Sequence, residues 1–173
     1  MSRDILKTLQ TEHDALRELF SQMEETTDRA KKTRAELLAD IEANLLPHAK
    51  WEEEFFYPAF AARADRDGLK SHAEAIEEHR AVELTVLPDL KSAETDTPEF
   101  AGRAKVLGEF VDHHAKEEET TMFRMARKMF SAEERAEMDE QYESWKASPA
   151  AQAAISMSAA KSGMKSAARA LMS

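Results

Sequence analysis

The sequence predicts an all-α protein, an up-down-up-down four-helix bundle with an additional C-terminal helical segment. Helix-breaking residues are rare, with four glycines and five prolines among 173 residues, whereas helix-favouring Ala, Glu, Leu, Lys, Arg and Met are abundant. Apolar residues recur every three or four positions over four long segments, which is the spacing of amphipathic helices. The length is enough for one domain with a substantial core and too short for two.

Four segments carry this helical spacing. The third of them follows Asp67-Gly68 and contains Pro88, which we expect to kink the helix or end it early. The fourth follows SAETDTP, a turn-forming stretch that also supplies a helix start. Long helices joined by short turns favour antiparallel packing. The segments cover about residues 3–28, 33–63, 68–92 and 98–130.

The C-terminal part is predicted to form a fifth helix over about residues 131–146. It begins with Ser131-Ala-Glu-Glu, which matches a capping box formed by Ser131 and Glu134. We expect a bundle domain over residues 1–130 and a helical extension with a basic tail over 131–173. Two interpretations of the tail stay open, a loosely packed terminal helix and an anchor for a partner or an anionic surface.

Composition and charge exclude several classes of protein. The absence of cysteine excludes disulfides and thiolate-ligated metals. From Ala147 onward the chain carries +3 and no acid, so of the net charge of −10 the body carries −13. Such a body repels nucleic acid phosphates, and no DNA or RNA partner is expected. The start lacks the apolar run of a signal peptide and no stretch is long and apolar enough for a membrane span, which predicts a cytoplasmic protein.

Polar residues interrupt the apolar stripe of every predicted helix. A histidine and a glutamate four residues apart lie on one face and can direct an imidazole and a carboxylate to the same point. Each residue advances a helix by about 1.5 Å. When the helices pack antiparallel, these polar residues therefore lie at similar positions along the bundle axis. The residues are His13 in the first helix, His48 and Glu52 in the second, His79 and Glu83 in the third, and His114 and Glu118 in the fourth.

Helix phase separates these seven residues from their neighbours. His113 and Glu117 have the same four-residue spacing, but they point about 100° away from the stripe, toward a flank. The other glutamates in the runs 52–54 and 117–119 are expected to be mostly solvated.

The seven residues predict a metal centre. Unpaired carboxylates and imidazoles would be costly in an apolar bundle, and metal ions remove that cost. Each residue alone is compatible with a core histidine or a solvated glutamate, but their convergence from four helices favours metal ligation. Mixed nitrogen and oxygen ligands suit iron, manganese or zinc better than calcium or magnesium. Four imidazoles and three carboxylates favour two ions bridged by a glutamate.

At these residues the chain resembles the hemerythrin-like HHE cation-binding family. The order His13, His48-x3-Glu52, His79, His114-x3-Glu118 carries the resemblance, which covers about residues 3–130. The stretches EEEFFYP and EEETTMF are similar to the family's signatures, with Arg124 where a proline would recur. The resemblance implies a non-haem centre of two iron ions, and chemistry with dioxygen, peroxide, nitric oxide or iron itself.

The chain departs from the oxygen-carrying members of that family. His79 is followed four residues later by Glu83 where those proteins have a second histidine, and Glu118 stands where they have an aspartate at a longer spacing. More anionic ligands stabilise ferric iron and disfavour reversible oxygen binding. We therefore expect a diiron protein that reacts with or senses oxidants, and peroxidase-like, catalase-like or oxidase activity with an unknown reductant stays open.

Alternative functions remain at this point. One is a non-catalytic protein that binds or stores iron or oxygen, and another is a metal-free helical module that binds a partner through its basic tail. Tyr57 is a candidate source of an electron or a proton near the metals, with ordinary core packing as the alternative. His72 is a candidate channel residue, with a surface position or a supporting position just outside the metal ligands as the alternatives.

Overall fold

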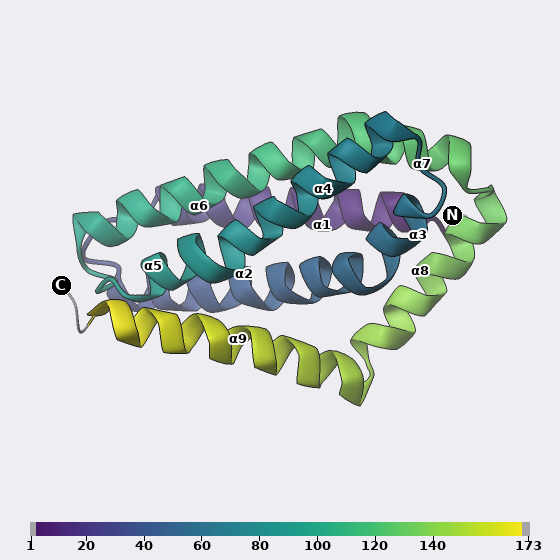
Figure 1. Cartoon of the computed structure of the whole chain (residues 1–173). Helices are drawn as coiled ribbons and strands as arrows, with labels where there is room; N and C mark the ends of the chain where they lie inside the picture. The colour runs from purple at the N-terminus through teal and green to yellow at the C-terminus, as the bar shows by residue number, and fades with distance from the viewer. Residues whose placement is uncertain (1–2, 171–173) are drawn as a thin grey trace.

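A computed structural model describes residues 3–170, except for the side chains at 161–162 and 165–170. Every regular element in the described range is a helix, so the all-α prediction is confirmed. The helices from Ile5 to Met129 form long rods that lie side by side, and each rod runs opposite to the one before it in the chain (Figure 1). No helix in this range has the length and apolar character needed to cross a membrane.

The first rod is one helix, and each of the other three is two α-helices joined by a π-helical turn. The rods are α1 (Ile5–Glu24); α2 (Lys31–Trp51), η1 (Glu52–Phe56) and α3 (Tyr57–Ala61); α4 (Arg66–Ala81), η2 (Val82–Val86) and α5 (Leu87–Lys91); and α6 (Pro98–Glu117), η3 (Glu118–Met122) and α7 (Phe123–Met129).

Each π-helical turn contains one residue more than an α-helical turn, so the helix is locally wider. In η1 the amide of Tyr57 donates to the carbonyl of Glu52, five residues earlier. Pro58 and Pro88 follow η1 and η2 closely, and a wider turn relieves the clash of a proline ring with the carbonyl four residues before it. Of the two effects expected of Pro88, a kink or an early end of the helix, the early end does not occur, because the rod continues to Lys91. Arg124 follows η3 instead, so proline is not required for the turn. Such turns are frequent at functional sites.

Side chains cap several of the helices as the sequence predicts. Ser131 and Glu134 form the expected capping box at the start of α8 (Ala132–Lys146). The Thr97 side chain accepts a hydrogen bond from the amide of Phe100 at the start of α6. These bonds satisfy backbone amides that have no partner within their helix and so fix where each helix begins.

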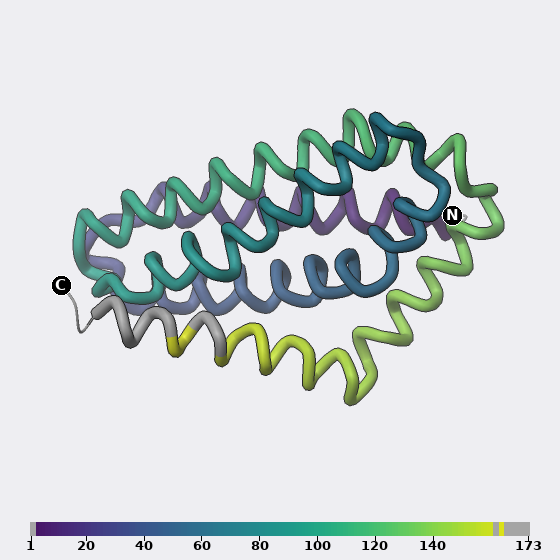
Figure 2. Tube along the Cα trace, viewed as in Figure 1, coloured from purple at the N-terminus to yellow at the C-terminus, as the bar shows by residue number. Residues whose placement is uncertain are grey.

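The C-terminal helices pack on the bundle. Helix α8 crosses one end, and α9 (Pro149–Ala170) runs back alongside α2 and α5 (Figures 1 and 2). Tyr142 and Trp145 of α8 and Ala151 of α9 are buried in the apolar core at that end. The described part of α9 is therefore packed rather than loose. The side chains of Lys161, Lys165 and Arg169, on which the basic-tail interpretation depends, lie outside the described residues.

Two apolar clusters fill the bundle on either side of a polar layer. Leu9 belongs to the cluster at the end covered by α8, and Leu16 belongs to the cluster toward the opposite end. His13 lies between these two leucines on α1 and is buried. In the same way, His48 lies between Leu45 of the second cluster and Trp51 of the first. The polar layer is thus enclosed by apolar packing along the bundle axis.

Candidate metal centre

Four buried histidines, one from each rod, meet in the polar layer. The Nε2 atoms of His13 and His48 lie 3.1 Å apart. Those of His79 and His114 lie 2.9 Å apart. Two ligand nitrogens about 2.1 Å from one ion would be separated by about 3 Å if their bonds met at right angles. Each histidine pair therefore has the spacing of two neighbouring ligands to a common metal ion.

Glu52 lies between the two histidine pairs. Its Oε1 is 3.3 Å from His48 Nε2, and its Oε2 is 3.6 Å from His79 Nε2. The two oxygens of one fully buried carboxylate thus face one histidine of each pair. Glu52 therefore offers one oxygen to each histidine pair.

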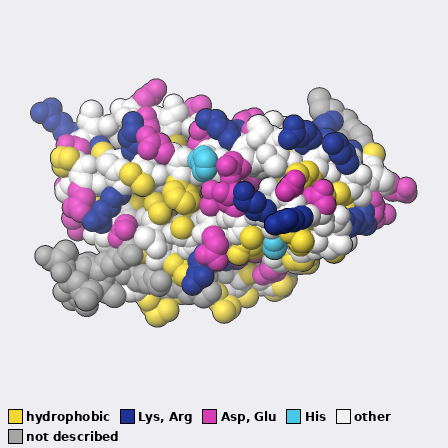
Figure 3. Space-filling view, turned by 45° about the horizontal axis from the view of Figure 1, so that its top comes forward, with side chains coloured by type: hydrophobic (Ala, Val, Ile, Leu, Met, Phe, Trp, Pro, Cys, Tyr) yellow, Lys and Arg dark blue, Asp and Glu magenta, His cyan; other side chains and the backbone are white. Residues whose placement is uncertain are grey.

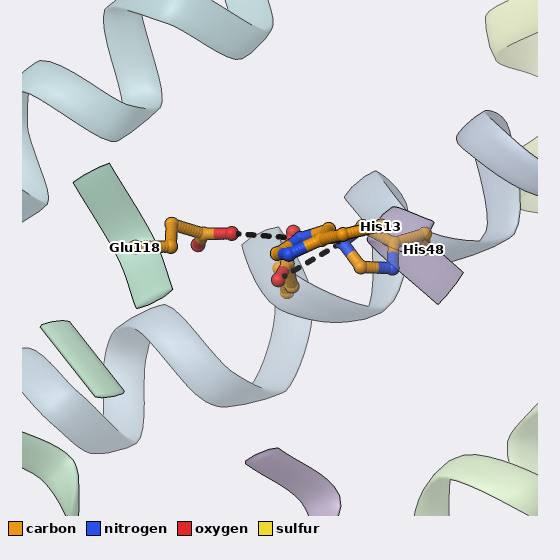
Figure 4. Close-up of side chains that lie close together, drawn as sticks. His13, His48 and Glu118 are labelled. Atoms are coloured by element: carbon orange, nitrogen blue, oxygen red, sulfur yellow. Dashed lines mark hydrogen bonds and ion pairs between the residues drawn. The ribbon is translucent and has the colours of Figure 1, made fainter. Parts of the chain in front are cut away.

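Glu118 also lies beside one histidine of each pair, with a single oxygen. Its Oε2 lies 3.2 Å from His13 Nε2 and 3.6 Å from His114 Nε2. Figure 4 shows this carboxylate directed at the His13 ring, with the His48 ring beside it. The other oxygen, Oε1, accepts a hydrogen bond of 2.8 Å from the hydroxyl of Tyr57.

The Nδ1 atom of every one of these histidines contacts a second glutamate, which we call its outer carboxylate. An ionised carboxylate only accepts hydrogen bonds, so the Nδ1 atom must carry the proton. The lone pair of a neutral ring then lies on Nε2 and points into the centre, and carboxylates hold metal-binding histidines in this way. The pairs are His13 with Glu119 at 2.9 Å, His48 with Glu12 at 2.9 Å, His79 with Glu53 at 3.2 Å, and His114 with Glu78 at 2.6 Å.

These four pairs form a closed ring around the bundle. The first rod provides Glu12 to the histidine of the second, and the second provides Glu53 to the histidine of the third. The third provides Glu78 to the fourth, and the fourth provides Glu119 to the first. Each rod therefore orients the histidine of the next one in chain order.

The buried carboxylates present oxygens that the protein does not satisfy. Both oxygens of Glu52 and Oε2 of Glu118 have no hydrogen-bond partner among the described residues. Burying ionised oxygens in this way costs several kcal/mol unless a cation compensates them. Two imidazole nitrogens whose lone pairs face each other about 3 Å apart also repel, and a cation between them compensates this repulsion. The donor set of imidazole nitrogens and carboxylate oxygens fits a transition-metal ion.

The electrostatics of the centre favour positive charge. Burial alone would raise the pKa of Glu118, but His114 and His13 hold that pKa well below its usual range. Burial alone would lower the pKa of His48, but Glu52 and Glu12 raise it well above its ordinary value. The pKa of His114 is raised against burial by Glu118 and Glu78. The field that increases proton affinity also attracts a metal cation, which competes with those protons.

Comparison with known proteins decides the family. The hemerythrin HHE cation-binding domain family matches residues 4–126, which is most of the chain and includes the four histidines of the centre, Glu52, Glu118 and the outer carboxylates. The chain belongs to the hemerythrin HHE cation-binding family. The resemblance seen in the sequence is therefore confirmed.

Two relatives place the HHE domain in context. The crystal structure of a hemerythrin HHE cation-binding domain-containing protein from Mycobacterium kansasii superposes with a TM-score of 0.71 at 22% identity, covering 90% of this chain and 98% of that one. This similarity shows a common fold. A DNA nickase from Nostoc sp. is 28% identical over 134 residues, which is 76% of this chain. The chain spans 36% of the length of that relative.

Glu83 does not lie with the other six predicted residues. Its carboxylate accepts hydrogen bonds from Ser158 Oγ at 2.7 Å and from Lys50 Nζ at 3.3 Å. The π-helical turn η2 begins three residues after His79, whereas η1 and η3 each begin four residues after their histidine, at the glutamate itself. The widened backbone therefore starts one residue before Glu83, and this side chain faces α2 and α9. The expected convergence of seven residues is corrected to six.

Tyr57 lies where Glu83 was expected. Its hydroxyl oxygen is 3.1 Å from His79 Nε2 and 3.4 Å from His114 Nε2, in addition to its bond to Glu118. Burial, followed by the charge of Glu118, raises the pKa of Tyr57 well above its usual value. His72 packs its ring edge-on against Tyr57, with the ring centroids 6.0 Å apart, and so supports the tyrosine from outside the centre.

The outer carboxylates were not recognised from the sequence. Glu53 and Glu119 were expected to be solvated, but each turns toward the histidine of a neighbouring rod. A signal was present, because each directly follows a glutamate of the centre. Glu12 and Glu78 each directly precede a histidine of the centre, and this repeated Glu-His pair is the second signal.

A small cavity adjoins the centre on the side of the second apolar cluster. Its volume is about 40 Å³, and its wall includes His13, His48, His79 and His114. A water molecule occupies about 30 Å³ of liquid, so the space suits a ligand of two or three heavy atoms. Leucine and valine side chains form much of the remaining wall, which favours small uncharged molecules: Leu16, Leu45, Leu46, Leu87, Val82 and Val111.

Proposed function

We propose that the chain is a non-haem diiron protein that reacts with or senses a small oxidant, namely dioxygen, peroxide or nitric oxide. The observation that carries this proposal is the set of four inward Nε2 atoms, each fixed by an outer carboxylate, around buried carboxylate oxygens that lack partners. Such a set binds cations and has no evident role in a metal-free core. The family and the donor types both support metal binding.

Two donor groups support two ions. One group contains His13, His48, Glu52 and Glu118, and the donor atoms within it lie within 4.8 Å of one another. The other contains His79 and His114 with Glu52 again, within the same limit. Glu52 is common to both groups, and we assign it as the bridging ligand. Glu118 is the second carboxylate, shared between His13 and His114.

Tyr57 completes the second group. The donor group of His79 and His114 contains the carboxylate of Glu52, and the phenol oxygen of Tyr57 lies within 3.4 Å of both imidazoles. A metal cation lowers the pKa of groups beside it, which opposes the effect of burial on Tyr57. We assign Tyr57 as a ligand or as the group that donates a proton at its hydroxyl oxygen.

The side chains around the centre determine what reaches it. When bound, the two ions supply one-electron and two-electron redox chemistry toward small oxidants. The anionic donors Glu52 and Glu118, with Tyr57 beside them, favour oxidised iron, which supports reaction or sensing over reversible oxygen transport. The apolar cavity admits uncharged ligands of peroxide size, and the two apolar clusters exclude bulk water.

The name of the Nostoc relative does not extend to this chain. That protein is much longer, and the matched region covers 36% of it. The net charge of −10 also opposes binding to a phosphate backbone.

Metal analysis with an optical spectrum tests the proposal. Protein expressed in iron-replete medium is expected to contain about two irons per chain and to absorb in the near ultraviolet through ligand-to-metal charge transfer. A colourless, metal-free and fully folded protein refutes it. Addition of hydrogen peroxide then distinguishes reaction from sensing. An enzyme consumes peroxide over many turnovers, whereas a sensor changes its optical spectrum once.

A further inference from the structure

A second group of metal-binding side chains lies on the surface above the centre. The Nε2 atom of His113 is 3.7 Å from Glu78 Oε1 and 3.6 Å from Glu117 Oε1. The donor atoms of these three residues all lie within 4.8 Å of one another. His113 is 63% exposed, so this group, which we call the surface triad, is accessible from solvent.

The surface triad is connected directly to the centre. Glu78 faces His113 with Oε1, and its Oε2 accepts a hydrogen bond of 2.6 Å from Nδ1 of His114. Adjacent residues on a helix point about 100° apart, so His113 faces outward while His114 faces inward. One carboxylate therefore contacts both an exposed histidine and a histidine of the centre.

A pocket of about 150 Å³ leads inward from the same surface. Its wall includes Glu78 and Glu117 of the surface triad, and also His114 and Glu118 of the centre. Glu118 is only 1% exposed, and its Oε2 has no hydrogen-bond partner among the described residues. Residues of the centre and residues of the surface triad thus line one pocket, and Glu118 carries an unsatisfied oxygen just behind its wall.

The charge of this pocket favours cations. Four carboxylates line it, those of Glu74, Glu78, Glu117 and Glu118, and its described wall contains no lysine or arginine. On the face shown in Figure 3, acidic side chains gather beside an exposed histidine.

We propose that the surface triad is an uptake site for a hydrated divalent transition-metal cation and that the acidic pocket passes this cation to the centre. Three ligands at the surface, of which His113 is exposed, leave room for several bound waters, which makes exchange fast and binding weak. Glu78 then contacts the cation at the surface and also contacts His114, the histidine of the centre to which the cation passes. This inference rests on the proposed metal centre, which is its destination.

The test measures the rate at which the metal-free full chain takes up ferrous iron without oxygen. Metal retained after rapid desalting is followed over time in the wild type, His113→Ala and Glu117→Gln. Loss of a supporting ligand commonly weakens a metal site by about 10- to 100-fold, so both variants are expected to load at least about 10-fold more slowly. Their final metal content is expected to equal that of the wild type, because neither residue lies in the centre.

Glu109→Gln is the matched control. Glu109 is an exposed glutamate on the same helix, 67% exposed, and its removal changes the net charge equally. It is expected to load at the wild-type rate, and thermal unfolding of all variants checks that the fold is intact.

Equal loading rates for His113→Ala and the wild type overturn the inference and leave the proposed function standing. A lower final metal content in His113→Ala also overturns it, because His113 would then belong to the centre. A wild type that retains no metal at any time overturns both proposals.

Discussion

Replacing Glu52 by glutamine removes the carboxylate that both donor groups share. The substitution keeps the shape of the side chain, which is fully buried, and removes its negative charge. Because Glu52 faces His48 with one oxygen and His79 with the other, both of the proposed ions are expected to bind more weakly. Glutamine keeps one carbonyl oxygen, so it cannot bridge two ions with two anionic donors.

The effect on stability follows from ligand linkage. A free metal concentration about 100 times the dissociation constant stabilises the folded state by about 2.7 kcal/mol for each ion. If each affinity falls about 100-fold, the same concentration contributes about 0.4 kcal/mol for each ion. For two ions the metal-dependent stabilisation therefore falls by about 4 to 5 kcal/mol. In a protein of this size that corresponds to roughly 10–15 °C in the melting temperature.

The assay compares melting temperatures with and without metal within each variant. Taking the difference cancels any effect of the substitution on the metal-free fold. Glu54→Gln is the control, because Glu54 is exposed on the same turn and the change in charge is identical. The reasoning is refuted if Glu52→Gln keeps the wild-type difference, or if Glu54→Gln loses as much of it.

Three further experiments examine other parts of the molecule. His114→Ala is expected to reduce the final metal content whereas His113→Ala leaves it unchanged, since only His114 is buried in the centre; elemental analysis showing the reverse would mean that the helix phase is wrong. Tyr57→Phe is expected to fold normally and to lose visible phenolate-to-iron absorption, and an unchanged spectrum would exclude Tyr57 as a ligand. Hydrogen bonds from Arg63 and from the amide of the capping serine lower the pKa of Glu134 from 4.5 to about 2; its contribution to stability is therefore present above pH 4.5 and is lost as the pH falls toward 2. Unfolding of the wild type and Glu134→Gln over that range should converge at the acid end, and a constant difference between them would contradict this.

The helices and the inner histidines could be predicted because both follow from the regular repeat of the α-helix. Apolar spacing located four helical segments, and the same 100° rotation per residue selected His114 rather than His113 for the interior. The structure places His13, His48 and His79 on inner faces by the same rule.

The prediction failed for Glu83 because the number of residues per helical turn changes within three of the rods. A π-helical turn inserts a residue, and a helical wheel drawn at a constant angle cannot follow that change. The turn η2 begins at Val82, whereas η1 begins at Glu52 itself. Pro88 marks the widened turn, but a proline does not reveal at which residue it begins.

The outer carboxylates were missed for a different reason. A wheel places Glu53 and Glu119 off the apolar stripe, which in a single helix means solvent. In a bundle the same direction points at the neighbouring helix, where Glu53 meets His79 and Glu119 meets His13. Such pairing depends on how two helices are aligned along the bundle axis. The residue spacing within one helix gives no information about that alignment.

The closed ring of carboxylate and histidine pairs has a consequence for motion within the bundle. Each of its pairs crosses a different interface between rods, so a change at any one histidine acts on two interfaces at once. Metal loading is then expected to slow amide hydrogen exchange in the middle of all four rods together, as one cooperative unit, rather than in a single helical hairpin. Exchange would report the state of the centre from backbone positions that contact no ligand.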